Sequence, residues 1–349
     1  MFKRSGAGNY AYTAARVKAK KSKLLKEEDY NKMLMMSVPE ISHYISEAGY
    51  SKEMADLASR HSGISLVEYA TYTNMAKQFR SILDSATGDL SRMVAAYLTK
   101  WDFENLKVIL RGKMYGLSID DIREDLMPAG SLKVDDLEKI LAAASIEDAL
   151  ALFKSKTGLT VSDEAINCYK EEGVLAKIED ELSKAYYKSL LASIEGRDRA
   201  TSIFRNYIKY VIDAKNVETV LKLKVEGVSG EDAVAFFIPG GYEVNQKVYS
   251  QIAAAADLGA AFNEMQSLKM YAELKDTLTQ TATIMDIVNA IDKYKIKLAN
   301  QVAHMYPLSV IPVVEFMIHK EIEVRNIRMI AHGTDSGLDR DTMKNLLVI

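Results

Sequence analysis

Three stretches of the chain share one unusual pattern of apolar and polar positions. In each, apolar residues recur at helical spacing, and an asparagine stands in the middle of the apolar stripe. The asparagines are Asn105, Asn216 and Asn326, and an acid precedes each by three residues: Asp102, Asp213 and Glu323. The positions eight before, four before and four after the asparagine are apolar in every copy: Tyr97, Trp101 and Ile109; Ile208, Ile212 and Val220; Ile318, Ile322 and Ile330.

The same period continues beyond these helices. "GLSIDDIREDLMP" from Gly116 matches "GVSGEDAVAFFIP" from Gly227 and "GLDRDTMKNLLVI" from Gly337. The period is about 110 residues, far longer than that of ordinary solenoid repeats, so each copy is expected to be a small helical domain. The expected domains are 1–120, with a basic N-terminal helix, 121–230 and 231–349. A weak relative of the element that follows the repeat, "LLKEEDYNKMLM" from Leu24, precedes the first copy.

Helical periodicity runs through almost the whole chain, which has only 5 prolines and 18 glycines in 349 residues. The pattern therefore predicts an all-α fold. Breaks between helices are expected in these places: the turn at 116–118, "MPAGS" near Pro128, "SKTGL" near Gly158, "IEGRDR" near Gly196, "GVSGED" near Gly227, "IPGG" near Pro239 and "HGTDSG" near Gly333.

The asparagine of each copy is expected to point into packed apolar surface. A buried amide without partners costs about 1–3 kcal/mol, so it must be hydrogen-bonded. The carboxylate one turn earlier is within reach of the asparagine NH₂, and the pair is expected to capture backbone groups at an adjacent helix end. Two interpretations remain: a device that fixes one helix crossing in each domain, or a shared surface that contacts a partner.

The turn that follows the asparagine helix differs between copies. Lys224 and Val225 stand in the second copy where the first has the pair Gly112 and Lys113, and the third has "AHGTDSG" from Ala331.

Composition limits the classes of function. The chain is 48% hydrophobic and 27% charged, which suits a soluble globular protein with a substantial core. A net charge of −3 and a pI near 6.1 give no overall field that would recruit nucleic acid. The single cysteine, Cys168, cannot form an internal disulfide, and we expect a reducing, cytoplasmic location with no secretory signal. The apolar stretch 308–318 is too short to span a bilayer.

The N-terminal region from Lys3 to Lys26 is basic and contains no acid. It could contact phospholipid headgroups or acidic loops, and the alternative is an ordinary solvated helix face. The candidate contact residues are Arg16, Lys18, Lys20, Lys21 and Lys23.

Enzymatic chemistry finds weak support. "DDIRED" from Asp120 matches the DDxx[DE] pattern that binds Mg²⁺ and diphosphate in all-α prenyl-transferring enzymes, and "DDLEK" from Asp135 could be the second acidic motif. The equivalent positions of the other copies read "GED" and "RDT", which indicates only acids near a helix start. The sequence contains no HExxH and no GxxxxGK[ST], so we predict no catalytic residue, cofactor, metal or small-molecule substrate.

With these motifs in hand, the chain resembles a known family. "NYAYTAARVKAKKSKLL" from Asn9, the acid-x-x-Asn helices ending "ILRGKMYGLS" and "NIRMIAHG", and the three long repeats look like the C subunit of archaeal A-type ATP synthases, the counterpart of the d subunit in V-type ATPases. The resemblance implies an all-α funnel of three similar helical domains around a pseudo-threefold axis. An unrelated helical-repeat scaffold is the alternative, and an Mg²⁺-dependent prenyl-diphosphate enzyme is the competing class.

The resemblance also implies a role without catalysis. A protein of this kind would be a rotor socket that joins the D and F subunits of the central stalk to the proteolipid (c/K) ring, peripheral on the cytoplasmic face of the membrane, within a large hetero-oligomer. The repeated motif and its neighbours then form the candidate structural or interface set: Asp102, Asn105, Arg111, Asp213, Asn216, Glu323, Asn326 and Arg328.

Overall fold

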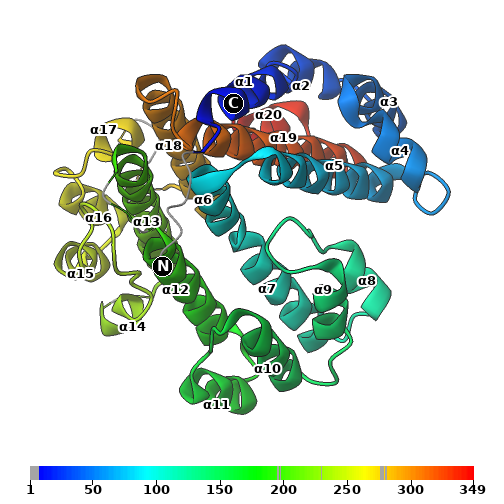
Figure 1. The fold of residues 1–349 in the computed structure, drawn as a ribbon. Coiled ribbons are helices and arrows are strands. Elements are labelled where there is room, and N and C mark those ends of the chain that lie inside the picture. Colours follow the sequence, from blue (N-terminus) through cyan, green and yellow to red (C-terminus); the bar gives the residue numbers. More distant parts are fainter. Residues whose placement is uncertain (1–7, 195, 197, 229, 276–278, 280) are drawn as a thin grey trace, which may run out of the picture. The chain divides into compact units, whose positions relative to one another are not determined.

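Every regular element in the described part of the chain is a helix, which confirms the all-α expectation (Figure 1). The structure is a computed structural model. It describes residues 8–194, 196, 198–228, 230–275, 279 and 281–349. The chain divides into two units, and each is described by itself: unit 1 is Met1–Gly8 with Tyr72–Ile194, and unit 2 is Asn9–Thr71 with Glu195–Ile349.

Unit 1 contains α6 (Gly88–Leu98), α7 (Lys100–Met114), α8 (Ile119–Glu124), α9 (Val134–Leu141), α10 (Ile146–Thr157), α11 (Asp163–Glu172) and α12 (Ala176–Ser193). Helix α7 packs against α9, α10 and α12. Phe103 of α7 lies edge-on to Phe153 of α10 and Tyr186 of α12, with ring centroids 5.5 and 5.7 Å apart. The asparagine helix is therefore at the centre of the unit 1 core.

Unit 2 contains α1 (Tyr10–Lys21), α2 (Glu27–Met33), α3 (Val38–Ile45), the π-helical turn η1 (Ser46–Tyr50), α4 (Ser51–Leu57), α13 (Arg199–Val225), α14 (Gly230–Val234), α15 (Gln246–Ala254), α16 (Leu258–Glu264), α17 (Tyr271–Leu274), α18 (Ile284–Met305), α19 (Ile311–Asp335) and α20 (Arg340–Leu346). Helix α5 (Gly63–Ser85) begins in unit 2 and ends in unit 1. Helix α18 packs against α13 and α19, and α1 packs along α19 (Figure 1).

Two apolar clusters lie in unit 2. One is built by α13 to α18, with Tyr249, Ile252 and Ile287 fully buried. The other joins α2, α3 and α5 to the C-terminal helices α19 and α20, and it includes Ile41 and Ile327. Residues far apart in the sequence thus share one core.

The ends of the asparagine helices explain why the chain turns where it does. Gly116, Gly227 and Gly337 adopt positive φ of 68°, 78° and 68°, which a side chain with a β-carbon rarely tolerates. The next amide then bonds back to an earlier carbonyl of the helix, as from Leu117 to the Gly112 carbonyl at 2.9 Å. This Schellman geometry occurs again at Val228 and Leu338.

Helix breaks near Gly116, Pro128, Gly158, Gly196, Gly227 and Pro239 are confirmed. The break predicted in "HGTDSG" is also confirmed, but it falls after Gly333: α19 continues through this glycine and ends at Asp335, and Gly337 has the positive φ of the turn. A β-carbon on Gly333 would lie 2.5 Å from the Met343 sulfur, so this glycine serves the close approach of α20 to α19.

Candidate functional site

The repeated acid–asparagine motif lies in the core of both units. Its members are on α7, α13 and α19, and every one is buried: Asp102, Asn105, Asp213, Asn216, Glu323 and Asn326. The flanking stripe is less uniform than predicted, since Trp101, Ile318 and Ile322 are only half-buried. The motif nevertheless faces the interior in all three copies.

In the first copy the motif holds the loop between α8 and α9. The Asn105 amide donates to the Met127 carbonyl oxygen at 2.7 Å, and the Met127 N–H donates back to Asn105 Oδ1 at 2.7 Å. Asp102 accepts the Ser131 N–H and hydroxyl at 2.8 and 2.6 Å and the Leu132 N–H at 3.0 Å. The two side chains therefore fix both ends of one loop.

The second copy repeats this arrangement in unit 2. Asn216 exchanges two hydrogen bonds of 2.8 Å with the backbone of Ile238. Asp213 accepts the Tyr242, Glu243 and Val244 amides at 2.9–3.1 Å. The loop before α15 is thus held as the loop before α9 is held in unit 1.

Glycine is required where each loop crosses its carboxylate. A β-carbon on Gly130 would lie 2.0 Å from Asp102 Oδ1, and one on Gly241 would lie 2.1 Å from Asp213 Oδ1. Real β-carbons do not approach oxygen so closely. The recurrence of these two glycines in the sequence therefore has a physical cause.

The third copy uses a different partner segment. Asn326 donates to the Val348 carbonyl at 2.8 Å and accepts its N–H at 3.2 Å, as in the other copies. Glu323, however, accepts the Leu25 N–H at 2.6 Å, from the loop before α2. The weak relative of the repeat element noted from Leu24 thus takes the place that the loops before α9 and α15 have in the other copies.

Glu323 also belongs to a buried polar cluster. It accepts the Tyr50 hydroxyl at 2.5 Å and the Lys320 ammonium at 2.7 Å, and Lys320 in turn donates to the Tyr50 oxygen at 2.8 Å. Burial and the Glu323 charge raise the pKa of Tyr50 well above its usual range, and burial lowers the pKa of Lys320. The cluster ties η1 and the start of α2 to α19.

Burial also raises the pKa of Asp102 and of Asp213, although the hydrogen bonds from their loops oppose this shift.

The expected contact of each asparagine NH₂ with the acid one turn earlier was wrong. The amide donates instead to the loop backbone. The carboxylate accepts from a later part of the same loop or, in the third copy, from the N-terminal segment. The expectation that the pair captures backbone groups next to a helix end is confirmed.

A lysine that follows the asparagine in two of the copies adds a further tie to the motif, and its alignment between the copies was wrong in the sequence analysis. Lys113 donates to the Leu141 and Ala143 carbonyls at 2.8 and 2.6 Å, and Lys224 donates to those of Ala253 and Ala255 at 2.6 and 2.7 Å. Both lysines stand at the same place after the asparagine, so Lys224 corresponds to Lys113 and not to Gly112. Each satisfies carbonyls at the end of the short helix after the loop.

The arginines of the candidate set reach neighbouring long helices. Arg111 binds Glu179 of α12 through two bonds of 2.6 Å. Arg328 binds Glu68 of α5 at 2.6 and 3.0 Å, and His332 contacts the same carboxylate at 2.8 Å. These pairs join the asparagine helix to the long helix beside it.

The basic N-terminal residues lie on or next to α1. Lys18 and Lys23 are exposed, whereas Arg16 and Lys20 are half-buried. Lys21 forms an ion pair of 2.6 Å with Glu315 of α19 and a hydrogen bond with Asn300 of α18. One member of the predicted contact set therefore holds α1 against the core of unit 2.

The acidic run at Asp120 has local partners. Asp120 pairs with Arg123, and Asp121 accepts the hydroxyl of the N-cap Ser118 at 2.6 Å. In the run from Asp135, Asp136 pairs with Lys156 at 2.7 Å. Across the described residues, no group of three or more histidine, cysteine, aspartate or glutamate side chains has the spacing of a metal site.

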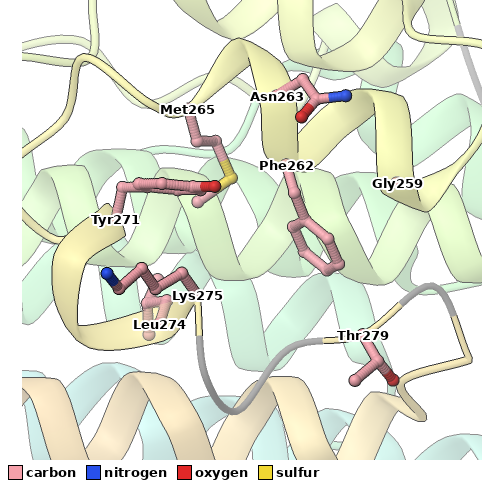
Figure 2. A pocket seen from close by; sticks show the side chains of 8 residues that line it. All are labelled: Gly259, Phe262, Asn263, Met265, Tyr271, Leu274, Lys275 and Thr279. Carbon is pink, nitrogen blue, oxygen red and sulfur yellow. The ribbon is translucent and has the colours of Figure 1, made fainter.

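Cavities of about 260, 300 and 360 Å³ are candidates for a ligand site, and the last is lined by Lys293, Lys297 and Asn300 of α18. One of about 260 Å³ lies between α16 and α17; Figure 2 shows Phe262 pointing into it and Thr279 across from that ring. Lys275 and Tyr271 are the ionisable side chains among its described lining residues. In unit 1 a second, of about 300 Å³, opens beside Asp102 and Ser131, which already bond each other.

No helix within the described residues combines the length and apolarity needed to cross a bilayer. Together, these features define a class of protein: an all-helical molecule in which one buried loop-holding motif is used three times.

The comparison with protein families then gives the particular family. The ATP synthase (C/AC39) subunit family matches residues 13–346, and the chain belongs to this family. The chain is 33% identical to the A-type ATP synthase C subunit of Methanosarcina acetivorans, over 99% of this chain and 95% of the relative. It is also 33% identical to the C subunits of Archaeoglobus fulgidus (97% of this chain, 96% of the relative) and Haloferax volcanii (99% of each).

Proposed function

We propose that this chain is a non-catalytic central-stalk component of an A/V-type ATP synthase. In this role it is a socket on the cytoplasmic face of the membrane, between the D and F subunits of the stalk and the proteolipid ring. The observation that carries the proposal is the motif that pins a loop to a long helix three times over, in a chain that belongs to the ATP synthase (C/AC39) subunit family.

A socket that transmits torque must be stiff. Long helices packed at interior density resist deformation, and a loop with both ends bonded to a buried side-chain pair cannot move independently of its helix. The lysines at 113 and 224 and the Arg111–Glu179 pair add further ties between helices. This pattern suits mechanical coupling, because its buried polar groups fix backbone in place.

We further propose that three similar helical domains, one for each copy of the motif, surround an axis as a funnel. The approximate threefold symmetry of such a funnel does not match a ring of many identical subunits, so the individual contacts between the funnel and the ring are not equivalent. Its contacts with the ring should therefore be distributed and polar. The exposed lysines of the α1 region, Lys18 and Lys23, suit acidic loops or lipid headgroups at that surface.

The test is co-purification. A tagged full-length chain, expressed in a host strain that carries the matching ATP synthase, should recover both the stalk proteins and the proteolipid from detergent-solubilised membranes. Lys18→Glu with Lys23→Glu should reduce recovery of the proteolipid more than that of the stalk. As a control, Lys154→Glu with Lys188→Glu changes charge equally at exposed positions of unit 1. Recovery of neither partner by the unmodified chain would rule out the proposal.

A further inference from the structure

Three lysines of unit 2 converge on one buried carboxylate. Lys215 and Lys222 of α13 both donate to Glu218 Oε1, at 3.2 and 2.7 Å, and Lys295 of α18 donates to Glu218 Oε2 at 3.3 Å. Glu218 itself is 6% exposed. We call these four residues the lysine cluster.

Among the described residues, no second carboxylate forms an ion pair with Lys215 or Lys222. Asp292 of α18 pairs with Lys295 at 3.3 Å and with Arg325 of α19. The Asp292 carboxylate therefore neutralises Lys295 and Arg325, and it forms no ion pair with Lys215 or Lys222. Lys215 and Lys222 are left to share a single carboxylate oxygen, and a third cation attracts the same carboxylate through its other oxygen.

At the equivalent position of the other two copies, positive and negative charges are equal in number. Glu218 stands two residues after its asparagine, and the equivalent residues are Lys107 and Arg328. Lys107 pairs with Glu104 at 2.9 Å and donates to the Ser183 hydroxyl at 3.0 Å, and Arg328 pairs with Glu68. Each has one carboxylate for one permanent cation. The excess of positive charge is thus a property of the second copy, and the repeat architecture does not require it.

This excess carries an electrostatic cost within the chain. Burial lowers the pKa of Lys215, and repulsion from Lys295 and Lys222 lowers it further, although Glu218 opposes both. The side chains of Lys215 and Lys222 remain 33% and 29% exposed, so an arriving anion can reach both. Glu218 already holds both ammonium groups in place, which reduces the side-chain entropy that binding would remove.

We infer that Lys215 and Lys222 form a binding site for a carboxylate of an acidic segment in a partner protein. The inference rests on the proposed function, because the partner is another component of the ATP synthase. A protein carboxylate fits better than a lipid surface: lysines that bind membranes extend freely into solvent, whereas these two lie bound against α13. Specificity comes from the pairing of two fixed cations with one arriving carboxylate.

The experiment measures binding of the full chain to an immobilised ATP synthase assembly that lacks this chain. Lys215→Gln with Lys222→Gln should weaken binding about 10-fold at low ionic strength and flatten its salt dependence. The control, Lys154→Gln with Lys188→Gln, removes the same charge at exposed positions and should change affinity less than about twofold. Both lysines also pair with the buried Glu218, so the melting temperature of the cluster variant should fall somewhat, and binding is compared at a temperature at which both variants are folded.

The outcomes separate the two proposals. If the unmodified chain does not bind the assembly, the proposed function fails; if it binds and the cluster variant matches the control, the inference fails. Anionic phosphatidylglycerol vesicles are the second probe. A loss of vesicle binding in the cluster variant, with assembly binding unchanged, would overturn the inference in favour of lipid. Should the double variant misfold, Lys222→Gln alone tests the same point, since Lys215 and Lys295 still pair with Glu218.

Discussion

The second and third copies of the motif hold equivalent loops with partners from opposite parts of the chain. Asp213 binds amides about 30 residues downstream, whereas Glu323 binds the Leu25 amide, 298 residues upstream. The asparagine partner lies 22 residues downstream in both. The acid of the motif therefore binds amides of a loop that precedes a short helix, whether that loop lies downstream or upstream in the sequence.

The acid itself reflects this difference. Asp213 is surrounded by backbone amides of its own loop. Glu323 has one more methylene and also reaches Tyr50 and Lys320, so a single side chain ties η1, the loop before α2 and α19 together. Neutral donors bind the acid in both copies, but in the third copy the carboxylate also pairs with the buried Lys320 of its own helix.

Removing the charge of the long-range connection should have the largest effect. Glu323→Gln leaves the buried Lys320 ammonium without its ionic partner and should destabilise unit 2 by roughly 3–5 kcal/mol. Asp213→Asn should cost about 2 kcal/mol, because it strands only backbone donors. Chemical denaturation of both variants measures the two values. Equal losses would show that the ion pair adds nothing to the third copy.

Filling the space at the loop crossing should cost less. Gly241→Ala and Gly130→Ala each force a methyl group onto a buried carboxylate and should destabilise their units by about 2–3 kcal/mol. Gly158→Ala is the control, since its positive φ is strained but its surroundings are open; we expect about 1 kcal/mol. Thermal unfolding would contradict the close-approach argument if all three variants behaved alike.

Substitutions of the three asparagines should destabilise the protein by more similar amounts than substitutions of the acids. Asn105→Leu, Asn216→Leu and Asn326→Leu each strand one backbone N–H and one carbonyl, and each should cost roughly 1–3 kcal/mol. Their effects on unfolding free energy should agree within about 1 kcal/mol. An unchanged denaturant midpoint for any one of them would show that its loop is held by other contacts.

The smallest expected effect is one of pH on the lysine cluster. Burial of Glu218 raises the pKa of its carboxyl group, but the ammonium groups of Lys295, Lys215 and Lys222 outweigh this effect and hold the pKa below its ordinary value of 4.5. A lowered folded-state pKa stabilises the protein above the unfolded-state value, and this contribution is lost as the pH falls toward the folded-state pKa. Glu218→Gln should therefore cost about 1–2 kcal/mol near neutral pH and progressively less in acid. A gap in unfolding free energy that is constant with pH would contradict this assignment.

Spacing along single helices predicted the fold class, the burial of the motif and most helix ends, because these depend on residues close in sequence. The break in "HGTDSG" was predicted, but its two glycines look the same in the sequence: Gly337 ends α19, whereas Gly333 lies inside the helix and allows the close approach of α20. The weak repeat element from Leu24 was visible in the sequence, but its contact with Glu323 was not, because spacing along single helices does not record a contact across 298 residues. Lys215 and Lys222 look like ordinary surface lysines until the fold brings Lys295 onto the same carboxylate.

The central claim is that three helical domains, each containing one copy of the motif, form a socket for the rotor shaft. Electron cryomicroscopy of the intact ATP synthase, isolated through a tag on this chain, tests it most directly. We predict density for this chain between the central stalk and the proteolipid ring, with all three motif-bearing helices, α7, α13 and α19, arranged around the foot of the shaft. Density for the chain on the catalytic head or a peripheral stalk, or a shaft that meets only one of these helices, would contradict the account.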